Sequence, residues 1–110
     1  MEQVDKALED FIKAIKYTKI YTEYEEQKEH IKNYPDLKQR IDEFRERNYL
    51  LHNSGDTSNL FEEMDRFREE YEQFQEIPMV HDFLEKELAY CRMLQYINEK
   101  IVWAFEADFE

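Results

Sequence analysis

The chain has 110 residues, of which 42% are hydrophobic and 38% charged, and its formal net charge is -12. One glycine, two prolines and sixteen Phe and Tyr residues are typical of a helical domain and exclude a disordered chain or a turn-rich sheet protein. The acidic charge repels phosphate backbones and anionic lipid headgroups, so we expect neither direct nucleic-acid binding nor membrane binding. We expect a single helical domain over residues 1–110.

The first apolar stripe predicts a helix from about Glu2 to Lys32. Its first half carries apolar residues at the spacing of one helix face: Val4, Leu8, Phe11 and Ile15. Its second half carries a displaced stripe: Tyr17, Tyr21, Tyr24 and Ile31. The buried face is therefore expected to shift halfway along this helix.

The second helix is expected to start at Pro35, because proline is tolerated at the first helical position and disfavours a helical residue before it. Its apolar stripe consists of Leu37, Ile41, Phe44 and Leu51. Asn48 occupies the same stripe, where a polar residue often fixes the register of packing.

Turn-forming residues surround Gly55, which predicts a loop over residues 52–58 and a left-handed helix stop at the glycine. Asn59 followed by Glu62 has the spacing of a helix-start capping box. The third helix then repeats apolar residues at spacings of four and three: Leu60, Met64, Phe67, Tyr71 and Phe74. Residues 54–76 also carry a net charge of -6, which predicts an acidic face.

The fourth helix follows Pro78 and has two apolar faces. One contains Val80, Leu84, Leu88 and Cys91. The other contains Phe83, Tyr90, Leu94, Ile97, Ile101 and Phe105. A surface helix usually has an apolar arc near 100°, so a helix that is apolar over more of its circumference is central or interfacial. We therefore expect the second face to contact another subunit.

Together these elements predict an all-α fold of four helices in two antiparallel hairpins, with long first and last helices, that forms a homodimer or a higher homo-oligomer. The N-terminal segment lacks the cationic start and apolar run of a signal peptide, and no stretch approaches the roughly 18 apolar residues of a membrane span. We expect a soluble, cytoplasmic protein.

Catalytic and metal-binding patterns are not found in the sequence. The residues three positions before the three histidines are Gln27, Tyr49 and Pro78, so the Glu-x-x-His pattern of carboxylate-bridged metal bundles is absent. A single glycine and a single cysteine exclude a glycine-rich phosphate loop and a zinc site of paired cysteines. We expect no enzymatic activity, no cofactor and no bound metal.

Cys91 lies on an apolar stripe, where cysteine usually acts as a small hydrophobic residue. We expect it in the core. The alternatives are a thiol that meets its counterpart across a dimer axis, or one ligand of a cluster shared between chains.

Two proline-led segments resemble the YlbF/YmcA family of small helical bacterial proteins. They are Tyr34-Pro35-Asp36-Leu37-Lys38, and the stretch from Ile77-Pro78-Met79-Val80 through Cys91, Leu94, Ile97 and Ile101. The resemblance implies an all-helical oligomer without its own enzymatic activity. It also implies a regulatory adaptor that acts with partner proteins on the endoribonuclease that starts messenger RNA decay, in competence, sporulation or biofilm formation. Members that share an iron-sulfur cluster use several cysteines, so a chain with Cys91 alone is not expected to bind one.

We therefore expect a non-enzymatic regulatory protein that oligomerises through its helices and binds other regulatory proteins. The alternative is a structural or chaperone-like helical oligomer without an RNA-processing partner, because the regular apolar repeat of the third helix suits a coiled coil as well.

Overall fold

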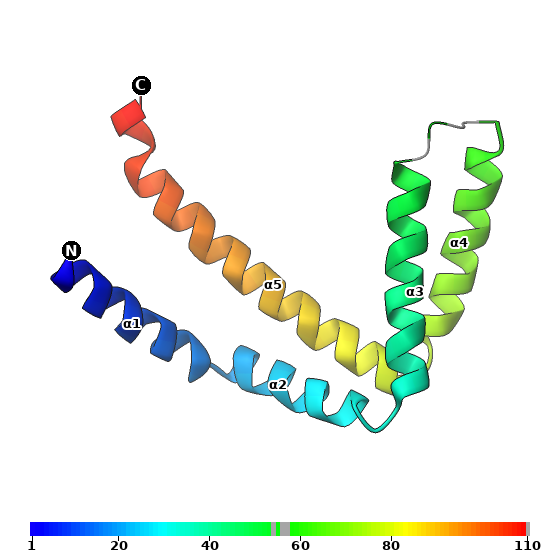
Figure 1. The fold of residues 1–110 in the computed structure, drawn as a ribbon, viewed down its shortest axis with the longest axis horizontal. Helices are drawn as coiled ribbons and strands as arrows, with labels where there is room; N and C mark the ends of the chain where they lie inside the picture. The colour runs from blue at the N-terminus through cyan, green and yellow to red at the C-terminus, as the bar shows by residue number, and fades with distance from the viewer. Residues whose placement is uncertain (54, 56–57, 110) are drawn as a thin grey trace. The chain divides into compact units, whose positions relative to one another are not determined.

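The computed structural model describes residues 1–53, 55 and 58–109. These residues form five α-helices and one 3-10 turn, with no strand among them (Figure 1). The elements are α1 (Glu2–Lys16), α2 (Lys19–Ile31), α3 (Pro35–His52), α4 (Leu60–Gln75), α5 (Pro78–Phe105) and η1 (Glu106–Phe109). The all-helical prediction is confirmed, whereas the prediction of four helices is wrong, because the segment from Glu2 to Lys32 forms two helices.

The break between α1 and α2 is made by Thr18. Its hydroxyl accepts a hydrogen bond from the backbone N–H of Tyr21 at 3.1 Å and donates one to the carbonyl of Ile15 at 2.7 Å. A threonine side chain at this position satisfies backbone groups that a continuous helix would pair with each other. The displacement of the apolar stripe in the sequence coincides with this break.

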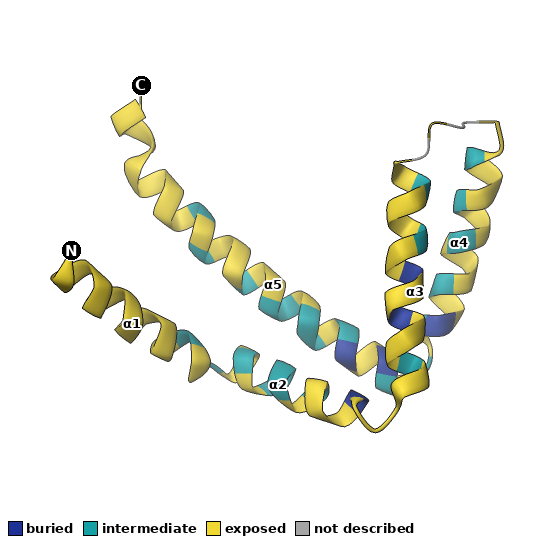
Figure 2. Cartoon of the chain, in the orientation of Figure 1, coloured by how far each residue is buried: buried dark blue, intermediate teal, exposed yellow. Residues whose placement is uncertain are grey.

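The chain divides into two compact units. Unit 1 comprises residues 1–28 and 84–110, and unit 2 comprises residues 29–83. All the residues that are buried in the described parts of the chain lie in unit 2, where Figure 2 shows them in dark blue. They are Ile31, Ile41, Phe44, Phe74, Val80 and Phe83. The expected single domain over residues 1–110 stays a prediction, and we describe each unit by itself.

Unit 2 is organised around Phe44, where α3 and α4 form an antiparallel hairpin (Figure 1). The ring of Phe44 stacks on Phe74 at 4.9 Å and meets the edges of Tyr71 at 5.2 Å and Phe67 at 5.8 Å between centroids. Such aromatic pairs add to the stability gained from apolar burial. The apolar stripes predicted for both helices therefore do face each other.

Arg47 connects α3 and α4 at the polar edge of the same hairpin. Its guanidinium group lies over the rings of Phe44 and Phe67, at 5.5 and 5.3 Å from their centroids. One of its nitrogens is 2.6 Å from a carboxylate oxygen of Glu70. The arginine thus combines cation–π contacts with an ion pair between α3 and α4.

The ends of the hairpin differ in detail from the sequence prediction. α3 stops at His52, and the backbone and side-chain amides of Asn53 both donate to the carbonyl of Tyr49. No described residue has a positive φ, so the left-handed stop predicted at Gly55 is not seen. Asn59 precedes α4 as predicted but makes no side-chain capping bond, so the capping box with Glu62 does not form.

In unit 1, α2 packs against the middle of α5 through tyrosines. Tyr24 stacks on Tyr90 at 4.8 Å, and Tyr21 contacts the same ring at 5.8 Å. Farther along, the Thr18 hydroxyl lies 3.8 Å from the sulfur of Met93. Because lower numbers in α2 meet higher numbers in α5, the two helices are antiparallel.

An ion pair borders these tyrosines. The carboxylate of Glu23 lies 3.0 Å from the ammonium group of Lys86 on α5 and 3.6 Å from that of Lys19. The hydrogen bond from Lys86 lowers the pKa of the Glu23 carboxyl below its ordinary value of 4.5. A lowered pKa in the folded state means that this carboxylate stabilises the fold at neutral pH and stops doing so as the pH falls through its pKa.

We predict that Phe44→Ala lowers the free energy of unfolding by about 3–5 kcal/mol, because it leaves a cavity among three aromatic rings. Chemical denaturation followed by circular dichroism measures this loss. Phe61→Ala is the matched control, because Phe61 lies on α4 with 82% of its surface exposed, and its loss should cost less than about 0.5 kcal/mol. Equal effects of the two substitutions would contradict the proposed core.

We predict that Glu23→Gln destabilises the protein at pH 7 but not at acid pH. At acid pH the wild-type Glu23 carboxylate becomes protonated and no longer forms an ion pair with Lys86. The difference in thermal midpoint between the wild type and Glu23→Gln should therefore shrink below about pH 4. Glu26→Gln, an exposed position on the same helix, should show little difference at either pH. A Glu23→Gln effect that stays constant from pH 7 to pH 3 would refute the role of this ion pair.

Candidate protein-binding surface

The second half of α5 exposes three of the six apolar residues that the sequence predicted to contact a partner. Leu94 is 38% exposed, Ile101 51% and Phe105 56%, and Ile97 is half-buried. We call Leu94, Ile97, Ile101 and Phe105 the α5 stripe. No described segment of the chain encloses these side chains, so the apolar surplus of α5 is present in the folded chain.

Two other predicted interface residues lie elsewhere. Phe83 is 3% exposed and belongs to the core of unit 2, so it is not available to a partner. Tyr90 is half-buried against Tyr21 and Tyr24 and therefore marks the border between the packed and the exposed parts of α5.

Apolar side chains extend around the other sides of the same helix. Trp103 is 66% exposed and Val102 54%, and neither lies in line with the α5 stripe by helical periodicity. A helix in water usually limits its apolar residues to one arc. This segment is therefore poorly suited to remain in contact with water on all sides.

The α1 helix carries a second exposed apolar face that the sequence analysis assigned to the core. No residue of α1 is buried, although α1 is strongly amphipathic. The exposed large residues on its apolar side are Val4, Leu8 and Phe11 of the predicted stripe together with Ile12, and we call these four residues the α1 face. The regular apolar spacing of α1 predicts that one face of the helix makes contacts. It does not distinguish contacts within one chain from contacts between two chains.

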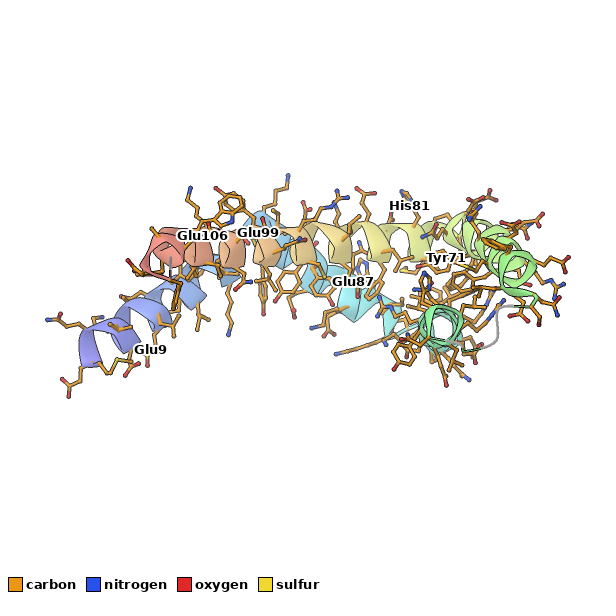
Figure 3. The ribbon with its side chains drawn as sticks, turned by 90° about the horizontal axis from the view of Figure 1, so that it is seen from above. Glu9, Tyr71, His81, Glu87, Glu99 and Glu106 are labelled. Atoms are coloured by element: carbon orange, nitrogen blue, oxygen red, sulfur yellow. The ribbon has the colours of Figure 1, made fainter. Side chains whose placement is uncertain are left out.

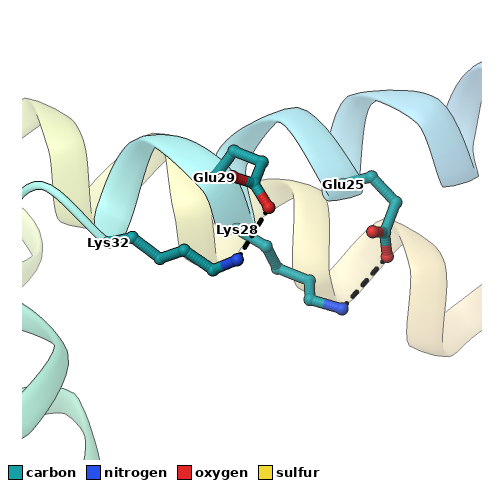
Figure 4. Close-up of polar contacts among 4 residues, drawn as sticks. All are labelled: Glu25, Lys28, Glu29 and Lys32. Atoms are coloured by element: carbon teal, nitrogen blue, oxygen red, sulfur yellow. Dashed lines mark hydrogen bonds and ion pairs between the residues drawn. The ribbon is translucent and has the colours of Figure 1, made fainter.

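The polar sides of the unit 1 helices carry ion pairs within each helix. On α1, Lys6 lies 3.6 Å from Asp10, and on α2, Lys28 lies 3.1 Å from Glu25 (Figure 4). The hydrogen bond to Glu25 raises the pKa of the Lys28 ammonium group. In unit 2, Lys32 directly after α2 lies 2.7 Å from Glu29 in the last turn of that helix, a contact that Figure 4 also draws. Lysines held in such pairs form an ordinary solvated face and do not make an anion-binding cluster.

Cys91 is an exposed free thiol, so its expected place in the core is wrong. The stripe on which it lies starts at the buried Val80, but Leu88 on the same stripe is already 50% exposed. The stripe leaves the packed part of the chain before it reaches the cysteine. One exposed thiol is by itself no cluster or redox site.

One turn of α5 brings together three groups that are able to bind a cation. The ligand atoms of His81, Asp82 and Glu85 lie within 4.8 Å of one another, and all three residues are exposed. Among the described residues no other group of three such side chains comes as close together. Glu9, Glu99 and Glu106, which Figure 3 labels, belong to α1, α5 and η1. Exposed groups of this kind are common on acidic helices, and they do not define a metal site.

The α3–α4 hairpin is bordered by open hollows. One, of about 380 Å³, is lined by Arg47, Leu50, Leu51, Glu63 and Arg66. A second of the same size is lined in part by Met64, Phe67 and Tyr71, the last of which Figure 3 labels. Their walls combine apolar and charged side chains and hold no pattern of nucleophile and base. They suit contact with a protein side chain more than a chemical reaction.

None of the described helices is long and apolar enough to cross a bilayer. Comparison with curated proteins and with solved structures gives no match.

A family model does match, and it covers nearly the whole chain. The matched segment is residues 4–104, which includes all of unit 2, most of unit 1 and all but the last residue of α5. The family is described as control of the competence regulator ComK, YlbF/YmcA. Both proline-led segments on which the resemblance was based lie within this match. The chain belongs to the YlbF/YmcA family, and its role is therefore regulatory.

Proposed function

We propose that this chain is a non-enzymatic regulatory adaptor of the cytoplasm that self-associates through unit 1 and binds other regulatory proteins. The single observation that carries the proposal is the exposure of the α5 stripe on a folded, highly charged helical chain. In this proposal residues 1–110 act as one functional domain, and the assembly is a homodimer or a higher homo-oligomer.

The energetic argument starts from the exposed apolar area. Burial of apolar surface is worth roughly 25 cal/mol per Å², so an interface that covers the α5 stripe has a favourable driving force of several kcal/mol. Contiguous exposed apolar patches on a soluble protein mark interaction sites. A second helix packed along Leu94, Ile97 and Ile101 would remove this area from water.

The charge distribution supports protein partners over nucleic acid. In unit 2, α4 exposes a row of carboxylates: Glu62, Glu63, Asp65, Glu69, Glu70 and Glu72. Such a row attracts basic surfaces and repels RNA, and it accelerates association with a basic partner. An adaptor of this kind would reach messenger RNA only through a protein that binds it.

The family resemblance supplies the biological part of the proposal. In this proposal the chain acts with partner proteins on the endoribonuclease that starts messenger RNA decay, and through it on competence, sporulation or biofilm formation. The match to a family that controls a competence regulator supports this direction.

We predict that Leu94→Asp and Ile97→Asp each convert a wild-type dimer into a monomer, because each forces a charge into a dry interface. Gel filtration with light scattering should give a mass near the 13.7 kDa of one chain for the variants and twice that mass for the wild type. Tyr96→Asp is the matched control, because Tyr96 is 60% exposed on a different side of α5 and should leave the dimer intact. A monomeric wild type, or variants that keep the wild-type mass, would contradict the proposed self-association.

We predict that the tagged protein co-purifies from its own host with the endoribonuclease or with that enzyme's accessory proteins, identified by mass spectrometry. The Ile97→Asp variant tests whether this association requires the assembled form, with Tyr96→Asp as control. Recovery of the protein with only copies of itself would contradict the adaptor role and favour a structural or chaperone-like oligomer.

A further inference from the structure

We infer that the α1 face is the second half of the self-association surface and that it takes the α1 helix of a second copy in antiparallel orientation. This inference rests on the proposed self-association and specifies its geometry. It adds to the α5 stripe a helix that sequence analysis placed in the core.

The first step is that the α1 face needs an occupant. Val4 is 58% exposed and Leu8 52%, and Phe11 and Ile12 are both exposed on the same side of the helix. Within unit 1, α5 contacts Thr18 and the α2 residues Tyr21, Glu23 and Tyr24. The described residues of the chain therefore bury no residue of α1, although the helix is amphipathic.

The second step is the distribution of charge along α1. Residues 2–10 have four acidic residues and one lysine, whereas residues 11–16, the remainder of α1, have two lysines and no acidic residue. The helix dipole favours acidic residues only in the first turn and basic residues only in the last. Glu9 and Asp10 lie in the middle of α1, so the separation of charge extends farther than the dipole requires.

The third step is symmetry. A two-fold axis perpendicular to a helix reverses its direction, so the acidic half of one α1 meets the basic half of the other. A parallel pair would instead align acidic with acidic and basic with basic. The interface of a two-fold dimer must be complementary to itself, and α1 meets this condition only in the antiparallel orientation.

Two residues define the edge where this complementarity acts. Asp5 and Lys16 are eleven residues apart, which is close to three full helical turns, so both lie on the same edge of the α1 face. Antiparallel pairing about Leu8 and Phe11 brings Asp5 of one copy close to the partner's Lys16. The two-fold axis creates the same pair a second time.

The size of the interface explains why α1 and α5 act together. A helix of 15 residues is about 22 Å long, and one such helix presents less than the roughly 800 Å² per partner of a standard stable interface. The α5 stripe belongs to the same unit and supplies further apolar area. An interface built from α1 and α5 of two copies reaches a size that either helix alone would not.

The test exchanges the two edge charges. Lys16→Glu and Asp5→Lys should each raise the dimer dissociation constant about tenfold at low salt, the size expected when two exposed ion pairs become repulsions. An equimolar mixture of the two variants should regain wild-type affinity, because Asp5 of one variant then meets Lys16 of the other and the two introduced charges attract each other. Analytical ultracentrifugation with one labelled variant measures both the homodimers and the mixed dimer.

Matched controls and opposite outcomes make the test decisive. Lys13→Glu makes the same charge change on the polar side of α1 and should shift the dissociation constant less than twofold. If Ile97→Asp breaks the dimer but Lys16→Glu behaves like Lys13→Glu, or if mixing restores nothing, the antiparallel α1 contact is wrong and the proposed self-association stands. If the wild type is a monomer at every concentration, the proposed self-association itself fails, and an α1 face that binds only a different protein becomes the explanation.

Discussion

The structure depends on an imbalance between apolar surface and the number of helices able to cover it in unit 1. Here α2 and the preceding Thr18 cover one side of α5 as far as Met93, and beyond that point α5 continues for more than three turns with apolar residues on several sides. Because water contact with these residues is unfavourable, the free energy of unit 1 falls if another helix covers them. Unit 2 differs in that its two helices and the adjoining segments bury six large side chains among themselves.

Much of the fold could be predicted from the apolar spacing. The stripes of α3 and α4 meet as expected, with Ile41, Phe44 and Phe74 buried, because two helices joined by a short loop must pack face to face to remove these rings from water. The break at Thr18 could not be predicted with the same rules. Its cause is a pair of side-chain hydrogen bonds with Ile15 and Tyr21, and threonine within a helical pattern makes such bonds only where the local backbone permits it.

The candidate surface was predictable in part for a similar reason. Periodicity shows that a helix has an apolar face, but it does not show which neighbour covers that face. Leu94 and Ile101 were expected at an interface and are exposed in the single chain, which leaves that interface a prediction, while Cys91 and the apolar stripe of α1 were expected in the core and are not buried. Phe83 was expected at the interface because it lies on the same apolar face of α5 as Leu94, but it is buried in unit 2.

The division of the chain into two units suggests a division of tasks. If two copies associate through α1 and α5, the apolar faces of unit 1 are buried between them. A different partner protein must then bind to another surface. Unit 2 then offers the acidic row of α4 and the open hollows beside Arg47 and Tyr71, which combine charge with exposed apolar walls. Charged residues at the rim make an interface specific and speed association, whereas apolar contact slows dissociation of the complex. An adaptor needs both properties on separate surfaces, because a surface that is already occupied by a second copy cannot recruit a different protein.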